Sequence, residues 1–249
     1  MRYFLEIQYR GTHYHGWQIQ ANAHTVQAEI EQALHTLLQL PTPITASGRT
    51  DTGVHALQQF AHLDTNIPLQ QFPHRHKLNL LLPRDIWIKN IYEVLPDAHA
   101  RFDAQWRTYE YRISAHKQPF LPKLCYECGY PLNLDLLRQA SQLLCQYEDF
   151  RAFSRVKTDV EHFRCQIKSA TWELADDLLV FRIVANRFLR GMVRAIVGTL
   201  LEVGRARLNL TGFEAVIQSG DRKKAGPAVP PEGLFLTEVQ YPYLLKPIA

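Results

Sequence analysis

Alternating apolar and polar positions mark the first ten residues and predict a half-buried strand. One face carries Tyr3, Leu5, Ile7 and Tyr9, and the intervening positions are Phe4, Glu6 and Gln8. A period of two assigns these sets to opposite faces. The period then changes: after Thr25, a favourable helix N-cap, apolar residues recur at helical spacing up to Pro41. This stretch predicts an amphipathic helix with one face on the core.

Similar patterns predict the remaining elements. Strands are expected on both sides of residues 48–53, the second ending near residue 63, and at 86–92, 108–113, 163–172, 178–184 and from 234 onward. Helices are expected at 132–144 and 187–204, and a short one ends at 78–83. In the helix expected at 187–204, Arg187, Arg190 and Arg194 recur at three and four residues. That spacing predicts one basic edge beside an apolar stripe.

The order of these elements favours a duplicated unit. Each half of the chain opens on a tyrosine-rich strand and contains one long amphipathic helix. We therefore predict an α+β fold with two similar domains, in which helices flank mostly antiparallel sheets. The expected boundaries are 1–104 for the N-terminal domain and 105–249 for the C-terminal domain.

Composition narrows the class of protein. The 249 residues are 46% hydrophobic and 21% charged, with a net charge of +4, which is ordinary for a globular protein and compatible with a polyanionic partner. We expect no secretory signal, no membrane span and a cytoplasmic location. Cys125 and Cys128 have zinc-like spacing, but no second close pair exists among the four cysteines, so we expect free thiols and no metal.

The most informative stretch for chemistry is residues 44–56. Gly48 and Gly53 bracket a turn that contains Arg49 and the lone carboxylate of Asp51. Glycines allow a sharp bend and close approach of a ligand. The glycine spacing resembles a phosphate-binding P-loop, but Val54 follows where lysine is required. The chain also lacks GxGxxG after a strand, HExxH and GxSxG, so no dinucleotide cofactor is expected.

A lone carboxylate, a nearby arginine and exposed aromatic residues suit an enzyme that acts on a nucleotide withdrawn from its stack. An ordinary polar turn remains an alternative, because loops favour these residues in any case. Two other functions are compatible with the pattern: a noncatalytic RNA-binding protein that stabilises RNA folding, and a hydrolytic nucleosidase acting on small molecules.

The chain resembles the A-type tRNA pseudouridine synthases over nearly its whole length. The resemblance is strongest in the unbroken stretch Gly48-Arg49-Thr50-Asp51-Thr52-Gly53-Val54-His55-Ala56. Further matches are Gly11-Thr12, Gly16-Trp17-Gln18, Thr25-Val26-Gln27, Leu78-Asn79, His99-Ala100-Arg101-Phe102, Arg107-Thr108-Tyr109, Asp149-Phe150, Phe188-Leu189, Met192-Val193-Arg194, Ile196-Val197-Gly198 and Gly233-Leu234.

The resemblance implies a homodimeric isomerase that converts uridine to pseudouridine at positions 38, 39 and 40 of the tRNA anticodon stem-loop. It also implies a catalytic cleft between the two domains, with Asp51 as nucleophile and without metal or cofactor. Three routes stay open for the carboxylate: attack on the sugar C1′, proton removal to a glycal-like intermediate, or attack on C6 of the base.

Three further site residues follow from the same resemblance. Tyr109 is expected to stack on the target base and to help remove the C5 proton, although the alternation is also compatible with a core role for a strand tyrosine. Arg194 is expected to pair with Asp51, and a nearby cation favours the ionised carboxylate that a nucleophile needs. Arg49 is expected to fill the space of the flipped-out nucleotide or to bind its phosphate.

Four positions depart from the family pattern. Arg10 stands where aspartate is usual, Leu57-Gln58 replaces a small pair ending in glycine, Glu148 replaces histidine, and Ala228-Val229 replaces Thr-Ala. None of them is a residue assigned to chemistry. We expect them to affect local loop geometry and RNA contacts only.

Overall fold

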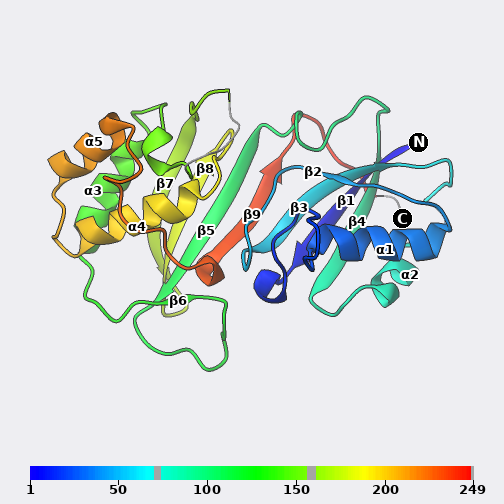
Figure 1. Ribbon diagram of the computed structural model, residues 1–249, viewed down its shortest axis with the longest axis horizontal. Coiled ribbons are helices and arrows are strands. Elements are labelled where there is room, and N and C mark those ends of the chain that lie inside the picture. The colour runs from blue at the N-terminus through cyan, green and yellow to red at the C-terminus, as the bar shows by residue number, and fades with distance from the viewer. Residues whose placement is uncertain (70–73, 156–160, 248–249) are drawn as a thin grey trace. The chain divides into compact units, whose positions relative to one another are not determined.

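The computed structural model describes residues 1–69, 74–155 and 161–247. The chain divides into two compact units, each with strands and helices (Figure 1). Unit 1 contains Met1–Gln105 together with Phe235–Ala249, and unit 2 contains Trp106–Leu234. Residues 235–249, which belong to the expected C-terminal domain 105–249, therefore group with the N-terminal part of the chain.

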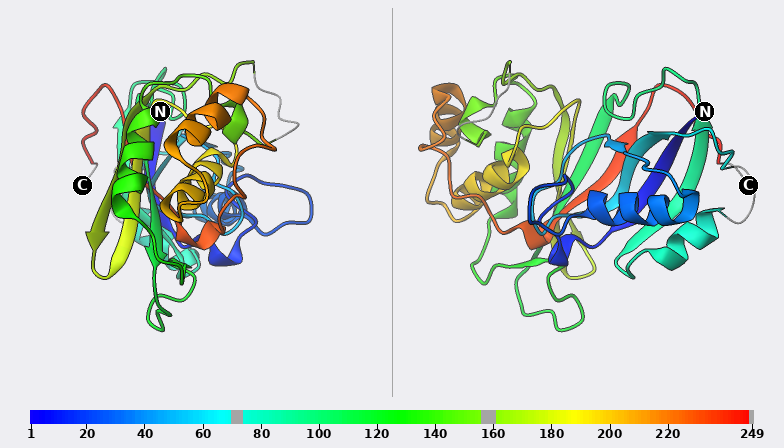
Figure 2. Two further views of the ribbon diagram at one scale, coloured as in Figure 1. Left: turned by 90° about the vertical axis from the view of Figure 1, so that its left-hand side faces the viewer. Right: turned by 45° about the vertical axis from the view of Figure 1, so that its right-hand side comes forward.

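Unit 1 contains a sheet with the order β4-β1-β3-β9. Strand β1 (Arg2–Tyr9) runs antiparallel to both β3 (His55–Asp64) and β4 (Ile86–Val94), and the short β2 (Thr45–Ala46) also pairs with β3. Strand β9 (Leu234–Gln240) joins β3 in parallel through His55 and Ala56. Helices α1 (Val26–Leu38) and α2 (His74–Leu81) complete the unit, and η1 (Gly11–His13) follows β1. Figure 2 shows α1 lying across the strands of this unit.

Helix α1 begins where the sequence predicts. The Thr25 side chain accepts a hydrogen bond from the Ala28 amide, and Val26, Ile30 and Leu34 are buried on one face. The helix ends at Leu38, and its C-cap Gln39 adopts the left-handed conformation before Pro41. The predicted strand β1 is also present, but both of its faces are buried, because Phe4 and Glu6 are covered as completely as Leu5. The prediction of a half-buried strand is wrong in this respect.

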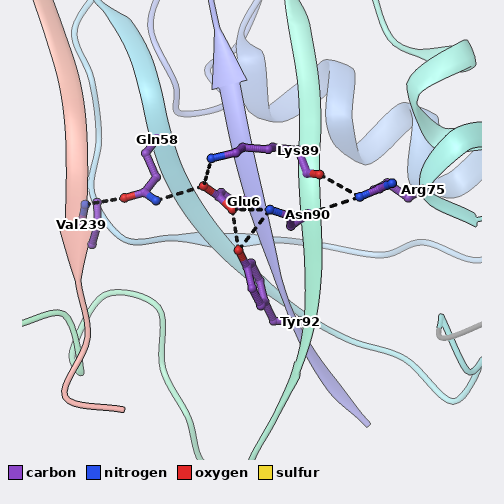
Figure 3. A network of polar contacts seen from close by, with 7 residues as sticks. All are labelled: Glu6, Gln58, Arg75, Lys89, Asn90, Tyr92 and Val239. Atoms are coloured by element: carbon purple, nitrogen blue, oxygen red, sulfur yellow. Dashed lines mark hydrogen bonds and ion pairs between the residues drawn. The ribbon is translucent and has the colours of Figure 1, made fainter. Parts of the chain in front are cut away.

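Four donors satisfy the buried Glu6 carboxylate (Figure 3). Gln58 Nε2 and Lys89 Nζ each lie 3.0 Å from Oε1, while Asn90 Nδ2 and the Tyr92 hydroxyl lie 2.8 and 2.5 Å from Oε2. Burial acts to raise the pKa of Glu6, but these hydrogen bonds outweigh it and lower the pKa below its ordinary value. The network joins β1 to both of its neighbours.

Gln58 also ties the network to the last strand. Its amide oxygen accepts a hydrogen bond of 2.9 Å from the Val239 amide of β9, so one side chain joins β1, β3 and β9 (Figure 3). A glycine at this position can make neither contact. The expectation that Leu57-Gln58 affects only loop geometry and RNA contacts is therefore wrong for Gln58.

Unit 2 contains the strand order β5-β8-β7. Strand β8 (Leu178–Ala185) pairs antiparallel with β5 (Trp106–Ser114) and with β7 (Ile167–Ala175), and the two-residue β6 (Tyr126–Glu127) runs parallel to β5. Three helices, α3 (Leu134–Leu144), α4 (Met192–Gly204) and α5 (Leu210–Ser219), pack against one another. Figure 2 shows α4 and α5 to one side of β7 and β8. Short helices η2 (Arg151–Phe153) and η3 (Pro231–Gly233) complete the unit. The α+β class and the mostly antiparallel sheets are confirmed.

The helix predicted at 187–204 begins five residues later than expected, at Met192. Gly191 precedes it with a φ of +71°, a conformation that does not continue a right-handed helix. Arg187 and Arg190 therefore lie in the connection after β8, and the predicted basic edge of three arginines is wrong. Of the three, only Arg194 belongs to α4.

Two other elements differ from the sequence prediction. Strand β7 begins at Ile167 rather than near residue 163, because Arg164 forms an isolated bridge with Asp149 instead. Helix α5 was not predicted, although its ends carry clear signals: Asn209 caps the Gly212 amide and Gly220 adopts the left-handed conformation.

In the part of the chain that the structure describes, no helix has the length and apolar character needed to cross a membrane.

Candidate active-site residues

Asp51 lies in unit 1 on the loop between β2 and β3, and it is partly buried. The Val54 amide donates to the Asp51 carbonyl over 3.1 Å and closes a tight turn. Gly53 allows this turn, since its φ is +78°. Arg49 is exposed on the same loop. The structure thus places Arg49 and Asp51 two residues apart on one short, hydrogen-bonded segment.

Residues 9–17 brace the Asp51 loop from one side. The Tyr9 hydroxyl and Thr50 Oγ1 share a buried hydrogen bond of 2.7 Å. The Trp17 amide donates to the Thr50 carbonyl over 3.1 Å, and the Gly53 amide donates to the Tyr14 carbonyl over 3.3 Å. Both flanks of Asp51 are therefore fixed by groups more than thirty residues earlier in the chain.

Two glycines make this close packing possible. A Cβ on Gly16 would lie 2.5 Å from the Thr50 carbonyl oxygen, and the φ of Gly16 is +90°. A Cβ on Gly11 would lie 1.9 Å from the Val54 carbonyl oxygen. No side chain fits at such distances, so only glycine can occupy positions 11 and 16 beside the Asp51 loop.

Strand β3 holds both ends of the loop. At the entry, the fully buried Gln59 accepts a short hydrogen bond from the Ser47 hydroxyl and donates to the Gly48 carbonyl over 2.9 Å. At the exit, His55 Nδ1 accepts from the Gly11 amide over 3.0 Å, and the imidazole stacks on Phe235 of β9 with ring centroids 4.6 Å apart. The last strand of unit 1 thus supports the base of the loop.

Tyr109 lies on β5 in unit 2, opposite Ile183 of β8. Tyr111 and Ile113 share its face and are buried, whereas Tyr109 is only partly buried. Its ring meets Phe188 edge-on, with centroids 5.0 Å apart and an interplanar angle of 84°. Phe188 is the aromatic neighbour that the sequence prediction did not assign to the site. It follows β8 directly, in the connection that the predicted helix had absorbed.

Arg194 lies in the first turn of α4 and is held by the segment 225–230, which crosses that helix. Arg194 Nε donates to the Val229 carbonyl over 2.7 Å, and the Val229 amide donates back to the Arg194 carbonyl over 3.2 Å. Because the acceptor is a main-chain oxygen, the replacement of alanine by valine at 229 preserves this contact. Arg194 is thus anchored through one guanidinium nitrogen and the main chain.

Gly198 allows the crossing segment, residues 225–230, to approach α4 closely. A Cβ on Gly198 would lie 1.7 Å from the Pro227 carbonyl oxygen, so the two backbones are in direct contact. The Gly226 amide donates to Thr199 Oγ1 over 2.9 Å beside this contact. Arg194 is thereby aligned by a backbone packing that depends on Gly198.

Among the described residues, no group of three or more histidine, cysteine, aspartate and glutamate side chains is arranged to hold a metal ion. Cys125 and Cys128 are buried free thiols, and burial raises the pKa of Cys125 above its ordinary value. His13, at the end of η1, and His15 are both exposed.

Comparison with known proteins gives consistent results across the chain. A family model described as tRNA pseudouridine synthase matches residues 6–103 and 140–242. Proteins named tRNA pseudouridine synthase A are 48% identical in Parabacteroides distasonis, over 99% of this chain and 98% of that protein, and 47% identical in Bacteroides fragilis, over 97% and 96%. A protein of the same name from a Geobacillus species is 41% identical over 94% of this chain and 96% of its own length.

Proposed function

This chain belongs to the tRNA pseudouridine synthase family, and we propose that it isomerises uridine to pseudouridine at positions 38, 39 and 40 of the tRNA anticodon stem-loop. The observation that carries the proposal is the Asp51 loop, whose carboxylate stands on a tight turn braced by Tyr9, Tyr14 and Trp17. A rigidly positioned carboxylate is what a nucleophile needs. We further propose that the enzyme acts in the cytoplasm, as a homodimer, as its family membership suggests.

The reaction needs no co-reactant. The N1–C1′ bond of the uridine breaks, the uracil turns, and a C1′–C5 bond forms, while C5 loses its proton and N1 gains one. We assign the nucleophilic step to Asp51, acting on the sugar or on the base. Ionised carboxylates act as nucleophiles in this way in other reactions at an anomeric carbon.

Three residues are assigned to substrate binding. Tyr109 stacks on the target uracil, a role supported by its partial burial and by the edge-on Phe188 ring that limits its rotation. Arg194 pairs with the carboxylate of Asp51, and its anchoring to the Val229 carbonyl supports a fixed position. Arg49, exposed on the Asp51 loop, occupies the place of the flipped-out nucleotide or binds its phosphate.

Asp51→Asn tests the assignment, because it keeps the shape of the side chain and removes its nucleophilic oxygen anion. We expect tRNA affinity to be retained and tritium release from C5-labelled uridine in tRNA to be lost. Asp176→Asn, at an exposed position in the turn between β7 and β8, is the matched control and keeps full activity.

The same assay separates the competing functions. Undiminished release in Asp51→Asn refutes the nucleophile assignment. If the wild-type protein binds tRNA and releases no tritium, it is a noncatalytic tRNA-binding protein. Turnover of free nucleosides, with none on folded tRNA, identifies a nucleosidase instead.

A further inference from the structure

The loop that follows β5 presents an aromatic side chain entirely to solvent. We call residues 115–124 the Phe120 loop. Phe120 is 94% exposed, the largest exposed fraction of any large hydrophobic side chain among the described residues. Burying a phenylalanine side chain stabilises a folded protein, and Phe120 contributes almost nothing of this kind. A single exposed apolar residue is common in proteins, so the setting of Phe120 decides its meaning.

The Phe120 loop is ordered by its own hydrogen bonds. Ser114 Oγ, at its base, donates to the His116 carbonyl over 2.6 Å and accepts from the His116 amide and Gln118 Nε2 over 3.2 Å each. Two turns follow, in which the Leu121 amide donates to the Gln118 carbonyl and the Leu124 amide to the Leu121 carbonyl. The tip of the loop is thus held by consecutive turns above a fixed base.

Two adjacent residues at the tip of the loop differ in burial. Leu121 packs against the buried cluster of Cys125, Leu178 and Val180, which anchors the loop to β8. Phe120, one position earlier, points away from this cluster into solvent. Pro119 and Pro122 flank the pair and restrict the backbone on both sides. The exposed ring is therefore presented by a preorganised backbone, so a partner that binds it orders few additional bonds.

The ionised side chains of the Phe120 loop itself have one sign. Lys117 and Lys123 are exposed on this loop, and the sequence has no aspartate or glutamate between Glu110 and Glu127. A partner with an apolar surface gains nothing from these cations. Phosphate groups bind them, and an aromatic ring between two lysines can stack on a base at the same point.

We propose that the Phe120 loop is an RNA-binding element, in which Phe120 stacks on an unpaired base of the tRNA and Lys117 and Lys123 contact the adjacent phosphates. The inference rests on the proposed function, since it takes tRNA as the partner. It assigns a contact in unit 2 that serves affinity and takes no part in the isomerisation. Unpaired bases are the parts of RNA that proteins bind by stacking.

Phe120→Ala, Phe120→Trp and Leu174→Ala test the stacking contact. Leu174 is the matched control: it is 73% exposed on β7, and its neighbours Glu173, Asp176 and Asp177 are acidic. We expect Phe120→Ala to weaken tRNA binding roughly 5- to 150-fold, the range for loss of one base–aromatic stack. Phe120→Trp and Leu174→Ala keep wild-type affinity, and all three retain the kcat for tritium release at saturating tRNA.

The lysines are tested by the salt dependence of binding. Replacing Lys117 and Lys123 by glutamine lowers the slope of log Kd against log salt by roughly 0.7–0.9 for each phosphate that the protein no longer neutralises. Wild-type tRNA affinity in Phe120→Ala overturns the proposal, and so does an unchanged salt slope in the double variant. A shift of Phe120→Ala from dimer to monomer in sedimentation overturns it as well, because the ring then binds a second copy of the chain. The proposed function fails separately, through absence of tritium release in the wild-type protein.

Discussion

Replacing Gly198 by alanine tests whether the crossing segment 225–230 positions Arg194. The added Cβ would lie 1.7 Å from the Pro227 carbonyl oxygen and 2.9 Å from its carbonyl carbon. Ordinary contacts between such atoms are at least 3.4 Å, and both partners are backbone. The segment must therefore move away from α4, and its contacts with Arg194 and Thr199 move with it.

The decrease in the free energy of unfolding follows from the hydrogen bonds that this displacement breaks. The bond from Arg194 Nε to the Val229 carbonyl involves a charged donor, and such bonds contribute about 1.5–3 kcal/mol. The Val229 and Gly226 amide bonds contribute about 0.5–1.5 kcal/mol each. Alanine recovers about 0.8–1 kcal/mol of helix propensity. The expected loss is therefore about 2–5 kcal/mol, a large part of a typical stability of about 5–15 kcal/mol.

Urea unfolding and tritium release from C5-labelled tRNA measure the two consequences. We expect Gly198→Ala to lower the free energy of unfolding by this amount and to reduce kcat more than tRNA affinity. Gly212→Ala, inside α5, is the matched control, because its Cβ would meet side-chain atoms of Leu208 and Asn209 and no backbone atom. Wild-type stability and activity in Gly198→Ala, measured beside this control, would refute the positioning of Arg194 by the crossing segment.

Three further results are expected. The pKa of Glu6 is lowered in the folded state, so its contribution to stability is complete above about pH 5 and declines as pH falls through the lowered pKa. In urea unfolding, Glu6→Gln therefore has a free energy of unfolding about 1–3 kcal/mol below that of the wild type at pH 7, and the difference is smaller at pH 4. Gly16→Ala, with its φ of +90° and a Cβ 2.5 Å from the Thr50 carbonyl oxygen, reduces kcat for tritium release through a displaced Asp51 loop, at a cost in stability of about 1–3 kcal/mol. Tyr109→Phe keeps tRNA affinity and loses any proton transfer by the hydroxyl, whereas Tyr109→Leu loses affinity and kcat together.

Each of these expectations has a contrary result. A stability difference between wild type and Glu6→Gln that stays constant from pH 7 to pH 4 removes Glu6 from the pH dependence. Full kcat in Gly16→Ala shows that residues 9–17 do not set the position of Asp51. Equal and full activity in both Tyr109 variants assigns that tyrosine to the core.

Sequence periodicity predicted the elements whose cause is local. Helix α1 has its cap at Thr25 and a regular apolar face, and the sequences of β1 and β5 have the period of two expected of a strand. The burial of Glu6 was not predictable in this way, because Lys89, Asn90 and Tyr92 that satisfy it are more than eighty residues away. The start of α4 was missed because an apolar period does not register the left-handed backbone of Gly191.

The site shows the same division. The glycines around Asp51 and the resemblance to a family identified the loop, but its supports come from distant segments: Tyr9 and Trp17 on one side and Phe235 on the other. Phe188 beside Tyr109 was assigned to a helix, and the backbone contact at Gly198 leaves no signal in composition. Tertiary packing, which one sequence does not display, decides these contacts.

The pairing of β9 with β3 has a consequence for synthesis of the chain on the ribosome. Unit 2 is a continuous segment of residues 106–234, whereas unit 1 acquires its last strand, β9, only from Phe235 onward. Domains usually fold in order from the N-terminus as they emerge. Residue 235 is synthesised after all of unit 2, so the edge of β3 and the ring of His55 gain their partner Phe235 only then. The Asp51 loop, whose flanks are braced by residues 9–17, therefore gains its last support late in translation.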